Sequence, residues 1–490
     1  MTDDWESSSP RLRNLVLSDY MTQSAVRDIE NGLRTRALLI RSTDPDKADY
    51  PVPVTALPSP VCLQDHREIE NLQPLLNRVL DKLSLDKNVV VYCLENVSDD
   101  FVQNYLKIYR SLPESHRTKP ILCLNRHDFM YHSEDHDSCL HGCKQFKLVE
   151  FNLHSICFQS LSDGVFHHHN SLLRRFGIAS ENAKANMDST GGFARGFVEA
   201  YRLYNTSQGI SQESVTSFLM MVVEDKDVSW YYDQQMLLNA VELEGIPTMM
   251  VKSQELISTY RRDPDTNKLF VGNKEIAIVY YQTFYNPENF TDSEMWTLRA
   301  EMELSSAINV PNVRHTLVNM KLFQMRLSDP GFLASYTDSL EEASKLSSLF
   351  YTTLPLDLTP EGDRNAQLGI DRPGDYVLKP QREGGGNNLW DGALVRELER
   401  LSGDPGRSSY ILMRRIVSPK QEKKFVRRGV MSPIISTVSE FGFCSVYCTC
   451  PFGEVVMNKP VGTMVRTKDA NDNEGGIGMG IAAIDSPLFF

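Results

Sequence analysis

The sequence predicts an α/β protein with several units, on three observations. Short apolar or alternating runs bounded by polar turns, such as PILCLN (120–125) and KLVEFN (147–152), are typical of strands. Helical stretches separate them, which is the order found in α/β sheets. The 490-residue chain is long enough for two or three domains, and 41% hydrophobic residues allow a sizeable core.

The N-terminal region, residues 1–118, is predicted to be mainly helical and part of the main body. Residues 71–83 show one apolar face, formed by Leu72, Leu75, Leu76, Val79, Leu80 and Leu83. The short apolar run VVVYCL (89–94) is expected to be a strand. An α/β unit over residues 119–215 then holds PILCLN and KLVEFN.

A further α/β unit is predicted over residues 216–310. Its expected strands are SFLMMVVED (217–225), TMMV (248–251) and LFVGNKEIAIVYY (269–281), with a helix from Tyr232 to Glu244. Gly272-Asn273 is a hairpin-turn signal. We therefore expect these strands to pair with one another.

The last unit is predicted over residues 311–490. Residues 353–376 are rich in Pro, Gly and Asp and are expected to form the loop that leads into its strands. Those strands are expected at 376–380, 409–416, 433–449 and 454–462, with a helix over residues 393–401.

Charge and composition exclude several function classes. With 51 Lys and Arg against 64 Asp and Glu, the net charge of −13 disfavours general binding of nucleic acid or of an anionic membrane. No run approaches the roughly 18 apolar residues of a membrane span, and the start MTDDWESSSPRLRN lacks the apolar stretch of a signal peptide. Nine cysteines without regular spacing favour reduced thiols. We expect a cytoplasmic protein, with a secreted form as the alternative if a signal peptide was removed.

One cluster, HSEDHDSCLHGC (132–143), combines histidines and cysteines but lacks the paired, ordered spacing of a zinc site. We expect an exposed hairpin loop there and leave the roles of Cys139 and Cys143 open. The run His167 to His169 is placed on a helix that continues through SLLRRFG, and no chemistry is assigned to it.

The segment LKPQREGGGNNLW (378–390) is the strongest functional signal. Its strand ends in Lys379, a point charge for a phosphate, and Gly384 to Gly386 let backbone N–H groups approach a ligand that a side chain would obstruct. Glu383 is an oxygen ligand suited to the Mg²⁺ that accompanies a nucleotide triphosphate. The P-loop pattern GxxxxGK[ST] and a kinase-type HRD element are absent, so the nucleotide would be held in another way. Three glycines alone are typical of a flexible turn, but with KPQRE and NN they indicate a phosphate site.

KPQREGGGNNL, with YILM (410–413), MNK (457–459) and RTK (466–468), resembles eukaryotic glutathione synthetase, a member of the ATP-grasp superfamily. The motifs LNRHDFM (124–130), EFN (150–152), YYDQ (231–234) and LFV-x3-EIA-x-VYY (269–281) extend the resemblance. It implies an ATP-grasp fold, in which the nucleotide lies between two α/β units under a glycine-rich lid, with residues 216–310 as a substrate-binding unit. It also implies a homodimer through the N-terminal region.

The resemblance also assigns roles to single residues. Two Mg²⁺ ions are implied at Glu150, Asn152 and Glu383. ATP contacts are implied at Lys321, Lys379, Gln381, Glu383, Gly384, Gly385, Gly386, Asn387, Asn388, Trp390, Met413, Glu440, Lys468 and Glu474. Contacts to the peptide substrate are implied at Arg126, Ser155, Cys157, Asp227, Gln234, Gln282, Tyr285 and Arg466. Arg466 is the implied catalytic residue, because it would stabilise the tetrahedral intermediate.

The reaction implied by the resemblance joins two small molecules, γ-glutamylcysteine and glycine. The dipeptide carboxylate attacks the γ-phosphorus of ATP, and the resulting acyl phosphate is captured by the amine. Such a reaction asks the protein mainly to neutralise charge and to hold geometry. No side-chain nucleophile is required, and Cys157 is not assigned as one.

Departures from the family pattern gather on the peptide side. Gln282 stands where the family has an arginine, and Phe284 where it has a glycine. The other departures there are Cys157 for a serine, Gln159-Ser160 for a glycine pair and Asp227-Val228-Ser229 for Glu-Arg-Asn, while the nucleotide side mainly changes a tyrosine to Trp390. In this respect the chain is similar to the glutathione synthetase-like effectors that some plant-parasitic nematodes secrete. Two functions stay open: a carboxylate–amine ligase with weak glutathione synthesis, and a non-catalytic effector that keeps the fold and Mg·ATP binding.

Overall fold

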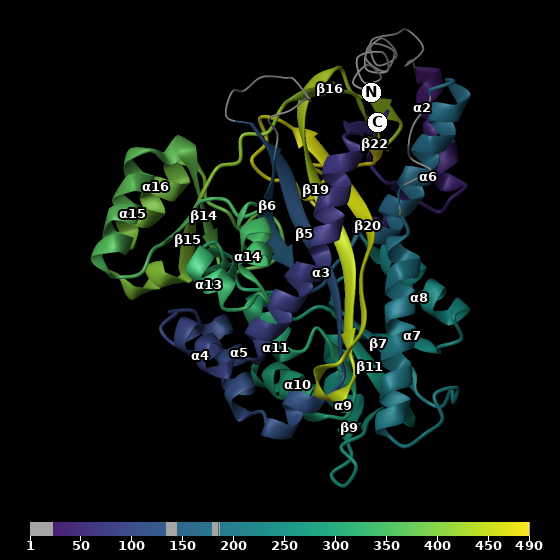
Figure 1. The fold of residues 1–490 in the computed structure, drawn as a ribbon. Helices are drawn as coiled ribbons and strands as arrows, with labels where there is room; N and C mark the ends of the chain where they lie inside the picture. Colours follow the sequence, from purple (N-terminus) through teal and green to yellow (C-terminus); the bar gives the residue numbers. More distant parts are fainter. Residues whose placement is uncertain (1–22, 134–144, 179–184, 186, 490) are drawn as a thin grey trace.

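The structure is a computed structural model that describes residues 23–133, 145–178, 185 and 187–489. Long strands run through its centre with helices around them (Figure 1), which confirms the predicted α/β class. Most of HSEDHDSCLHGC lies outside the described residues. The helices are α2 (Gln23–Arg34), α3 (Leu63–Leu85), α4 (Lys87–Leu94), α5 (Asp100–Ser111), α6 (Gln159–Arg175), α7 (Ser189–Ser207), α8 (Tyr231–Leu243), α9 (Ser253–Thr259), α10 (Ser293–Leu304), α11 (Val313–Val318), α12 (Lys321–Leu327), α13 (Pro330–Ala334), α14 (Leu340–Ser347), α15 (Pro360–Asp371) and α16 (Asp391–Arg400).

The largest sheet has nine strands within the described residues, in the order β18-β17-β3-β21-β20-β19-β5-β6 with β16 paired to β19. Its centre is antiparallel: β6 pairs with β5, β5 with β19, and β19 with β20. The strands are β3 (Val54–Thr55), β5 (Ile121–His132), β6 (Gln145–Asn152), β16 (Gln421–Lys423), β17 (Phe425–Arg427), β18 (Val430–Met431), β19 (Ile435–Thr449), β20 (Val455–Asp469) and β21 (Ala483–Asp485).

A second sheet confirms that the strands expected over residues 216–310 pair with one another. Its order is β8-β7-β11-β10-β9, with β12 paired to β11. The predicted hairpin turn joins β10 to β11, and Gly272 there has a φ of +60°, a conformation that favours glycine. The strands are β7 (Phe218–Val223), β8 (Thr248–Lys252), β9 (Tyr260–Arg262), β10 (Leu269–Val271), β11 (Lys274–Gln282) and β12 (Ile308–Val310).

A small sheet, β13-β15-β14, carries the strand that contains Lys379. It consists of β13 (Thr353–Pro355), β14 (Tyr376–Pro380) and β15 (Tyr410–Arg414). The sequence grouped these strands with 433–449 and 454–462, but the latter two are β19 and β20 of the large sheet. The remaining pairs are β1 (Leu39–Ile40) with β2 (Tyr50–Pro51), and β4 (Ser59–Val61) with β22 (Pro487–Phe489).

The run VVVYCL, predicted to be a strand, is the helix α4. Asp86 caps this helix by accepting a hydrogen bond from the backbone N–H of Val89. The buried residues of α4 are Val90 and Leu94, which lie four residues apart and therefore on one helix face. Packing beside α3 and α5 thus overrides the strand preference of the valines.

The predicted loop over residues 353–376 also needs correction, because it contains β13 and α15. Thr359 accepts a hydrogen bond from the N–H of Gly362, and Pro360 occupies the first helical position. Glu361 and Asp363 lie in the first turn. A Thr cap, a leading proline and acidic residues in the first turn are signals that start a helix. The Pro, Gly and Asp residues of this segment therefore indicate the start of α15 and not a continuous loop.

The central strands place an apolar and a charged face back to back. Residues buried against α3 on the first face are Phe129, Phe151, Phe441, Phe443 and Val465. Successive strand residues point to opposite faces. The other face therefore receives Arg126 and Asp128 of β5, Glu150 and Asn152 of β6, Glu440 of β19, and Arg466 and Lys468 of β20.

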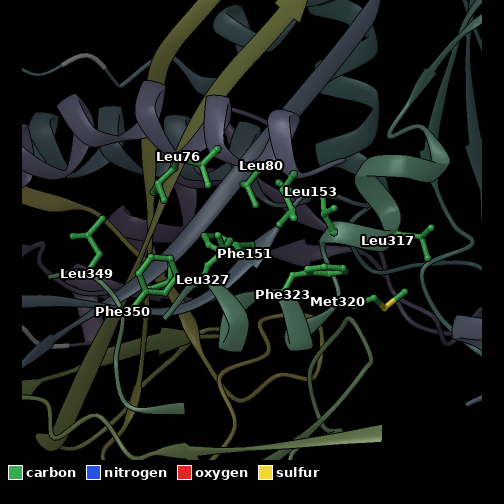
Figure 2. Packing of buried hydrophobic residues seen from close by; sticks show 14 of the residues in the cluster. Leu76, Leu80, Phe151, Leu153, Leu317, Met320, Phe323, Leu327, Leu349 and Phe350 are labelled. Carbon is green, nitrogen blue, oxygen red and sulfur yellow. The ribbon is translucent and has the colours of Figure 1, made fainter. Parts of the chain in front are cut away.

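The apolar core continues from this sheet to α12. Figure 2 shows Leu76 and Leu80 of α3, Phe151 of β6 and Phe323 of α12 gathered in one cluster. Phe323 has no exposed surface. Because α12 begins at Lys321, this packing also sets the position of that lysine.

We expect Phe323→Ala to lower the free energy of unfolding by about 3–5 kcal/mol, because it leaves a cavity in this cluster. Urea denaturation followed by circular dichroism measures the change. Leu340→Ala, at a side chain that is 81% exposed, is the control and should change stability by less than about 0.5 kcal/mol. Equal effects of the two substitutions would contradict this account of the core.

Candidate active site

Lys321 lies between two carboxylates that come from separate elements. Its Nζ is 3.0 Å from Oε2 of Glu150 on β6 and 3.3 Å from Oε1 of Glu383, in the loop after β14. The lysine side chain is only 5% exposed. Two carboxylates that converge on one buried cation form a pocket that favours positive charge.

One lysine does not neutralise both carboxylates. Burial alone would raise the pKa of Glu150, but Lys321, with Lys379 and Arg466, holds it well below its usual range. Burial raises the pKa of Glu383, and Lys321 only partly opposes this shift. A further cation beside Glu383 would therefore offset the cost of burying its charge.

The residues predicted to hold Mg²⁺ fit such an ion. Glu150 and Glu383 supply carboxylate oxygens, and Asn152 donates its Nδ2 to Oδ2 of Asp128 at 2.9 Å, which leaves its amide oxygen for a cation. Hard cations prefer these donors. No cluster of three or more His, Cys, Asp or Glu suited to a metal occurs in the described part of the chain, so the amide would complete the set.

The residues predicted for the nucleotide phosphates lie beside this pocket. Lys379 is buried, and its Nζ donates to the carbonyl of Val149, next to Glu150, at 2.8 Å. Gln381 is buried and accepts a hydrogen bond from the N–H of Leu322 at 3.0 Å, one residue after Lys321. Met413, predicted to contact ATP, is buried in β15 of the small sheet.

The glycine-rich loop follows Glu383. Gly384 and Gly386 have φ values of +84° and +89°, which favour glycine. Asn387 donates its Nδ2 to the carbonyls of Glu383 and Gly384, and Asn388 beside it is half-buried. A Cβ at Gly385 would lie 3.3 Å from Sδ of Met479, so a second loop of the chain lies against this one.

Glu474 joins the two loops. Its Oε2 accepts a hydrogen bond from the N–H of Gly386 at 3.0 Å, and its Oε1 accepts one from Nε1 of Trp390 at 3.1 Å. Lys468 donates its Nζ to the carbonyl of Asn473 at 2.6 Å, at the base of the second loop. Gly386, Trp390 and Glu474, three of the predicted ATP contacts, are therefore in contact with one another.

Arginines and carboxylates alternate along the charged face. Arg126 donates Nε and Nη2 to the two oxygens of Asp128, at 2.8 and 3.0 Å. Arg466 pairs through Nη2 with Oδ2 of Asp128 at 3.2 Å and with Oε1 of Glu440. The predicted catalytic arginine thus lies next to a predicted peptide-binding arginine.

The peptide-side residues surround the start of α6. Ser155 has a φ of +53°, and the carbonyl of Cys157 accepts a hydrogen bond from Nη1 of Arg126 at 3.3 Å. Asp233 holds this segment by accepting bonds from the N–H groups of Phe158 and Leu161. Burial raises the pKa of the Cys157 thiol to about 12.

Gln282 is buried and bonded to the protein itself. Its Nε2 donates to the carbonyl of Ile156 and to the hydroxyl of Tyr280, both at 2.7 Å, and Gln234 lies 3.5 Å from its Oε1. The hydroxyl of Tyr285 donates to Glu224. Asp227 is exposed, and its predicted role stays a prediction.

The nucleotide and peptide sides meet in a small cavity of about 10 Å³. Glu383 and Gln381 line it from one side, and Tyr285 and His154 from the other. Sequence reasoning missed His154 and Asp128. Asp128 lies two residues after Arg126 on a strand, so the period of two would have placed both on one face.

The buried histidines of α6 serve the packing of the helix. His169 pairs its Nδ1 with the hydroxyl of Ser486 and its Nε2 with the carbonyl of Thr55. The predicted helix through His167 to His169 is confirmed.

Comparison with known families shows to which family the chain belongs. The sequence model described as eukaryotic glutathione synthase, ATP binding domain, matches residues 17–489. The chain belongs to the eukaryotic glutathione synthetase family. The family predicted from KPQREGGGNNL and its companion motifs is confirmed, and glutathione synthetases are ATP-dependent ligases.

Relatives in this family match along most of their length. Glutathione synthetase of Bos taurus is 29% identical over 482 residues, which are 97% of this chain and 98% of that protein. The chloroplastic glutathione synthetase of Arabidopsis thaliana is 30% identical over 443 residues, which are 89% of this chain and 78% of that protein.

A solved structure shares the fold. The apo form of a glutathione synthetase-like effector from Globodera pallida superposes with a TM-score of 0.74 at 15% identity, covering 96% of this chain and 98% of that one. The likeness agrees with the glutathione synthetase fold. Among the described helices of this chain, none has the length and apolar character needed to cross a membrane.

For this glutathione synthetase family member, we expect Mg·ATP to raise the melting temperature, because a ligand that binds the folded state stabilises it by mass action. Glu383→Ala should remove most of that shift, since it deletes one of the two carboxylates beside Lys321. Glu341→Ala, at an exposed glutamate paired with Lys345, is the control and should keep the shift. Calorimetry that detects no ATP binding to the wild-type protein would refute the assignment of this site.

Proposed function

We propose that the chain is an ATP-dependent carboxylate–amine ligase that acts through an acyl phosphate and has an altered peptide site. The convergence of Glu150 and Glu383 on Lys321 carries this proposal. The glycine-rich loop directly follows Glu383, and Arg466 is near enough to act on the charge of Glu150. Membership of the glutathione synthetase family supports it.

The nucleotide side would balance the triphosphate charge. Glu150, Asn152 and Glu383 would hold Mg²⁺, which when bound supplies charge neutralisation and orientation of the phosphates. Lys321 and Lys379 would offset the remaining charge, and the N–H groups of the Gly384 to Gly386 loop would approach the γ-phosphate. With its charge neutralised in this way, ADP would leave the γ-phosphorus more readily than it would without these cations.

The amide-forming step requires stabilisation of the negative charge that develops on the carbonyl oxygen of the acyl group. The carboxylate of the first substrate attacks the γ-phosphorus, the bond to ADP breaks, and the acyl phosphate forms. The neutral amine of the second substrate attacks the carbonyl carbon, the bond from that carbon to the phosphate oxygen breaks, and the nitrogen loses one proton, so that an amide and hydrogen phosphate remain. Arg466 would stabilise the negative charge on the carbonyl oxygen. These steps require no side-chain nucleophile, and burial raises the pKa of the Cys157 thiol.

The peptide side differs from a site built for γ-glutamylcysteine. Gln282 is 2% exposed and spends both Nε2 hydrogens on Ile156 and Tyr280. Arg126 is bound by Asp128. A charged hydrogen bond contributes roughly 1.5–3 kcal/mol, so loss of an arginine at position 282 weakens binding of an anionic dipeptide by about tenfold or more. Glutathione synthesis is therefore expected to be weak.

The second candidate is a re-purposed protein, such as a secreted effector, that binds Mg·ATP without turnover. Internal partners at both Gln282 and Arg126 favour it. A homodimer is part of both proposals, and light scattering after size-exclusion chromatography measures it.

The two candidates differ in ADP release. We expect the purified protein with Mg·ATP to release ADP in the presence of one or more members of a panel of thiol peptides and amino acids, at a low rate with γ-glutamylcysteine and glycine. A coupled assay for ADP measures this. Gly385→Val should keep the fold and reduce the rate strongly, because a side chain there blocks backbone approach to the phosphates. Binding of ATP with no release for any pair would favour the non-catalytic protein.

Restoring a cation at position 282 tests the altered peptide site. Gln282→Arg should lower the KM for γ-glutamylcysteine by about tenfold, since the guanidinium can pair with a carboxylate. Gln282→Met is the matched control: it has a similar size, offers no donor and should not lower KM. Phe284 limits the gain, because its ring stacks on Phe290 in the core beside this strand. Efficient glutathione synthesis by the wild-type protein would show that the departures are compensated.

A further inference from the structure

The carboxylate of Asp128 connects three predicted site residues. Oδ1 accepts a hydrogen bond from Nε of Arg126 at 2.8 Å. Oδ2 accepts bonds from Nη2 of Arg126 at 3.0 Å, Nδ2 of Asn152 at 2.9 Å and Nη2 of Arg466 at 3.2 Å. Oδ1 thus accepts one of these hydrogen bonds and Oδ2 accepts three. Asp128 is only 1% exposed, so its carboxylate faces protein donors and not open solvent.

The contact with Asn152 decides which end of its amide faces away. Because Nδ2 is the donor to Asp128, the oxygen Oδ1 is the end that stays available for a cation. Partners of this kind orient metal ligands in many proteins. Without the carboxylate, the amide could turn its NH₂ toward the cation instead.

The contact with Arg466 fixes one end of the guanidinium. Both of its ion pairs, with Asp128 and with Glu440, use Nη2. Within the described residues, Nη1 of Arg466 donates no hydrogen bond. The fork is therefore held at one nitrogen while the other keeps its N–H groups for a negative charge.

Gly442 makes room for this arrangement. It is paired with Asp128 across the β5–β19 ladder. A Cβ at Gly442 would lie 2.7 Å from Oδ1 of Asp128 and 2.7 Å from Cδ of Arg126. Any side chain here would displace the Arg126–Asp128 pair.

We propose that Asp128 is a positioning residue of the ligase reaction, an inference that rests on the proposed function. Its buried carboxylate orients Arg126 and Arg466 toward the reacting carboxylate and turns the amide oxygen of Asn152 toward the cation. It touches neither substrate nor metal.

Asp128→Asn tests this role, because it keeps the size and removes the charge and one acceptor oxygen. The expected result is a kcat lower by about 10–100-fold and a half-saturating Mg²⁺ concentration higher by about 10–100-fold, with little change in the KM for ATP. A second readout does not depend on turnover. Mg²⁺ titrated calorimetrically into the complex with a non-hydrolysable ATP analogue should bind the variant more weakly by a similar factor.

Two further variants keep the outcome decisive. Gly442→Ala retains the carboxylate but crowds it, and should shift kcat and Mg²⁺ affinity in the same direction. Glu303→Gln removes a buried carboxylate paired with Arg299 at 2.8 Å outside the site. It should lower the melting temperature and leave kcat and Mg²⁺ affinity unchanged.

Wild-type kcat and Mg²⁺ affinity in Asp128→Asn would overturn the proposal, as would equal losses in Glu303→Gln. If Asp128→Asn does not fold, unchanged Mg²⁺ affinity in Gly442→Ala overturns it instead. A wild-type protein that releases no ADP with any substrate counts against the proposed function alone, and the calorimetric comparison then decides the role of Asp128.

Discussion

The strict alternation of side chains along β5, β6, β19 and β20 is the constraint on which the site depends. One face of these strands carries the phenylalanines that pack under α3, and the other carries the arginines and carboxylates. A slip of one residue in any pairing would exchange the two sets and bury charge in the core. The hydrophobic core thus determines the register, and the register in turn determines which charged groups meet.

Charge pairing at this face is not a device for stability. Lys321 has Glu150 and Glu383, Arg126 has Asp128, and Arg466 has Glu440. Desolvation of such groups costs about as much as their attraction returns, so buried pairs contribute little net stability. Their arrangement is better explained by chemistry that requires several fixed charges at short distance.

Local patterns in the sequence predicted most of the strands and helices, but they did not predict how the site residues come together. Alternating runs predicted β5, β6, β14 and β19, and Gly272-Asn273 predicted its hairpin turn. The errors arose where local signals competed: the valines of α4 favour a strand until Asp86 caps a helix, and the proline of α15 begins a helix instead of breaking one. The meeting of Lys321 with Glu150 and Glu383 depends on the packing of distant segments, which no local window contains. The resemblance to a family predicted these residues. Asp128 was missed, because its role is visible only from the alternation of side chains along β5 and from its contacts in the folded structure.

Lys321 also connects two of the sheets. Glu150 belongs to the nine-stranded sheet, whereas Glu383 lies three positions after the end of β14 in the small sheet. The ammonium group between them therefore forms an ionic link between a strand of one sheet and the loop that follows a strand of the other. A change in the spacing of the two sheets here would alter the distance between the lysine and at least one carboxylate. Because Coulomb energy varies with the inverse of distance and is large for buried charges, the relative position of the sheets and the electrostatic potential of the site are coupled at Lys321.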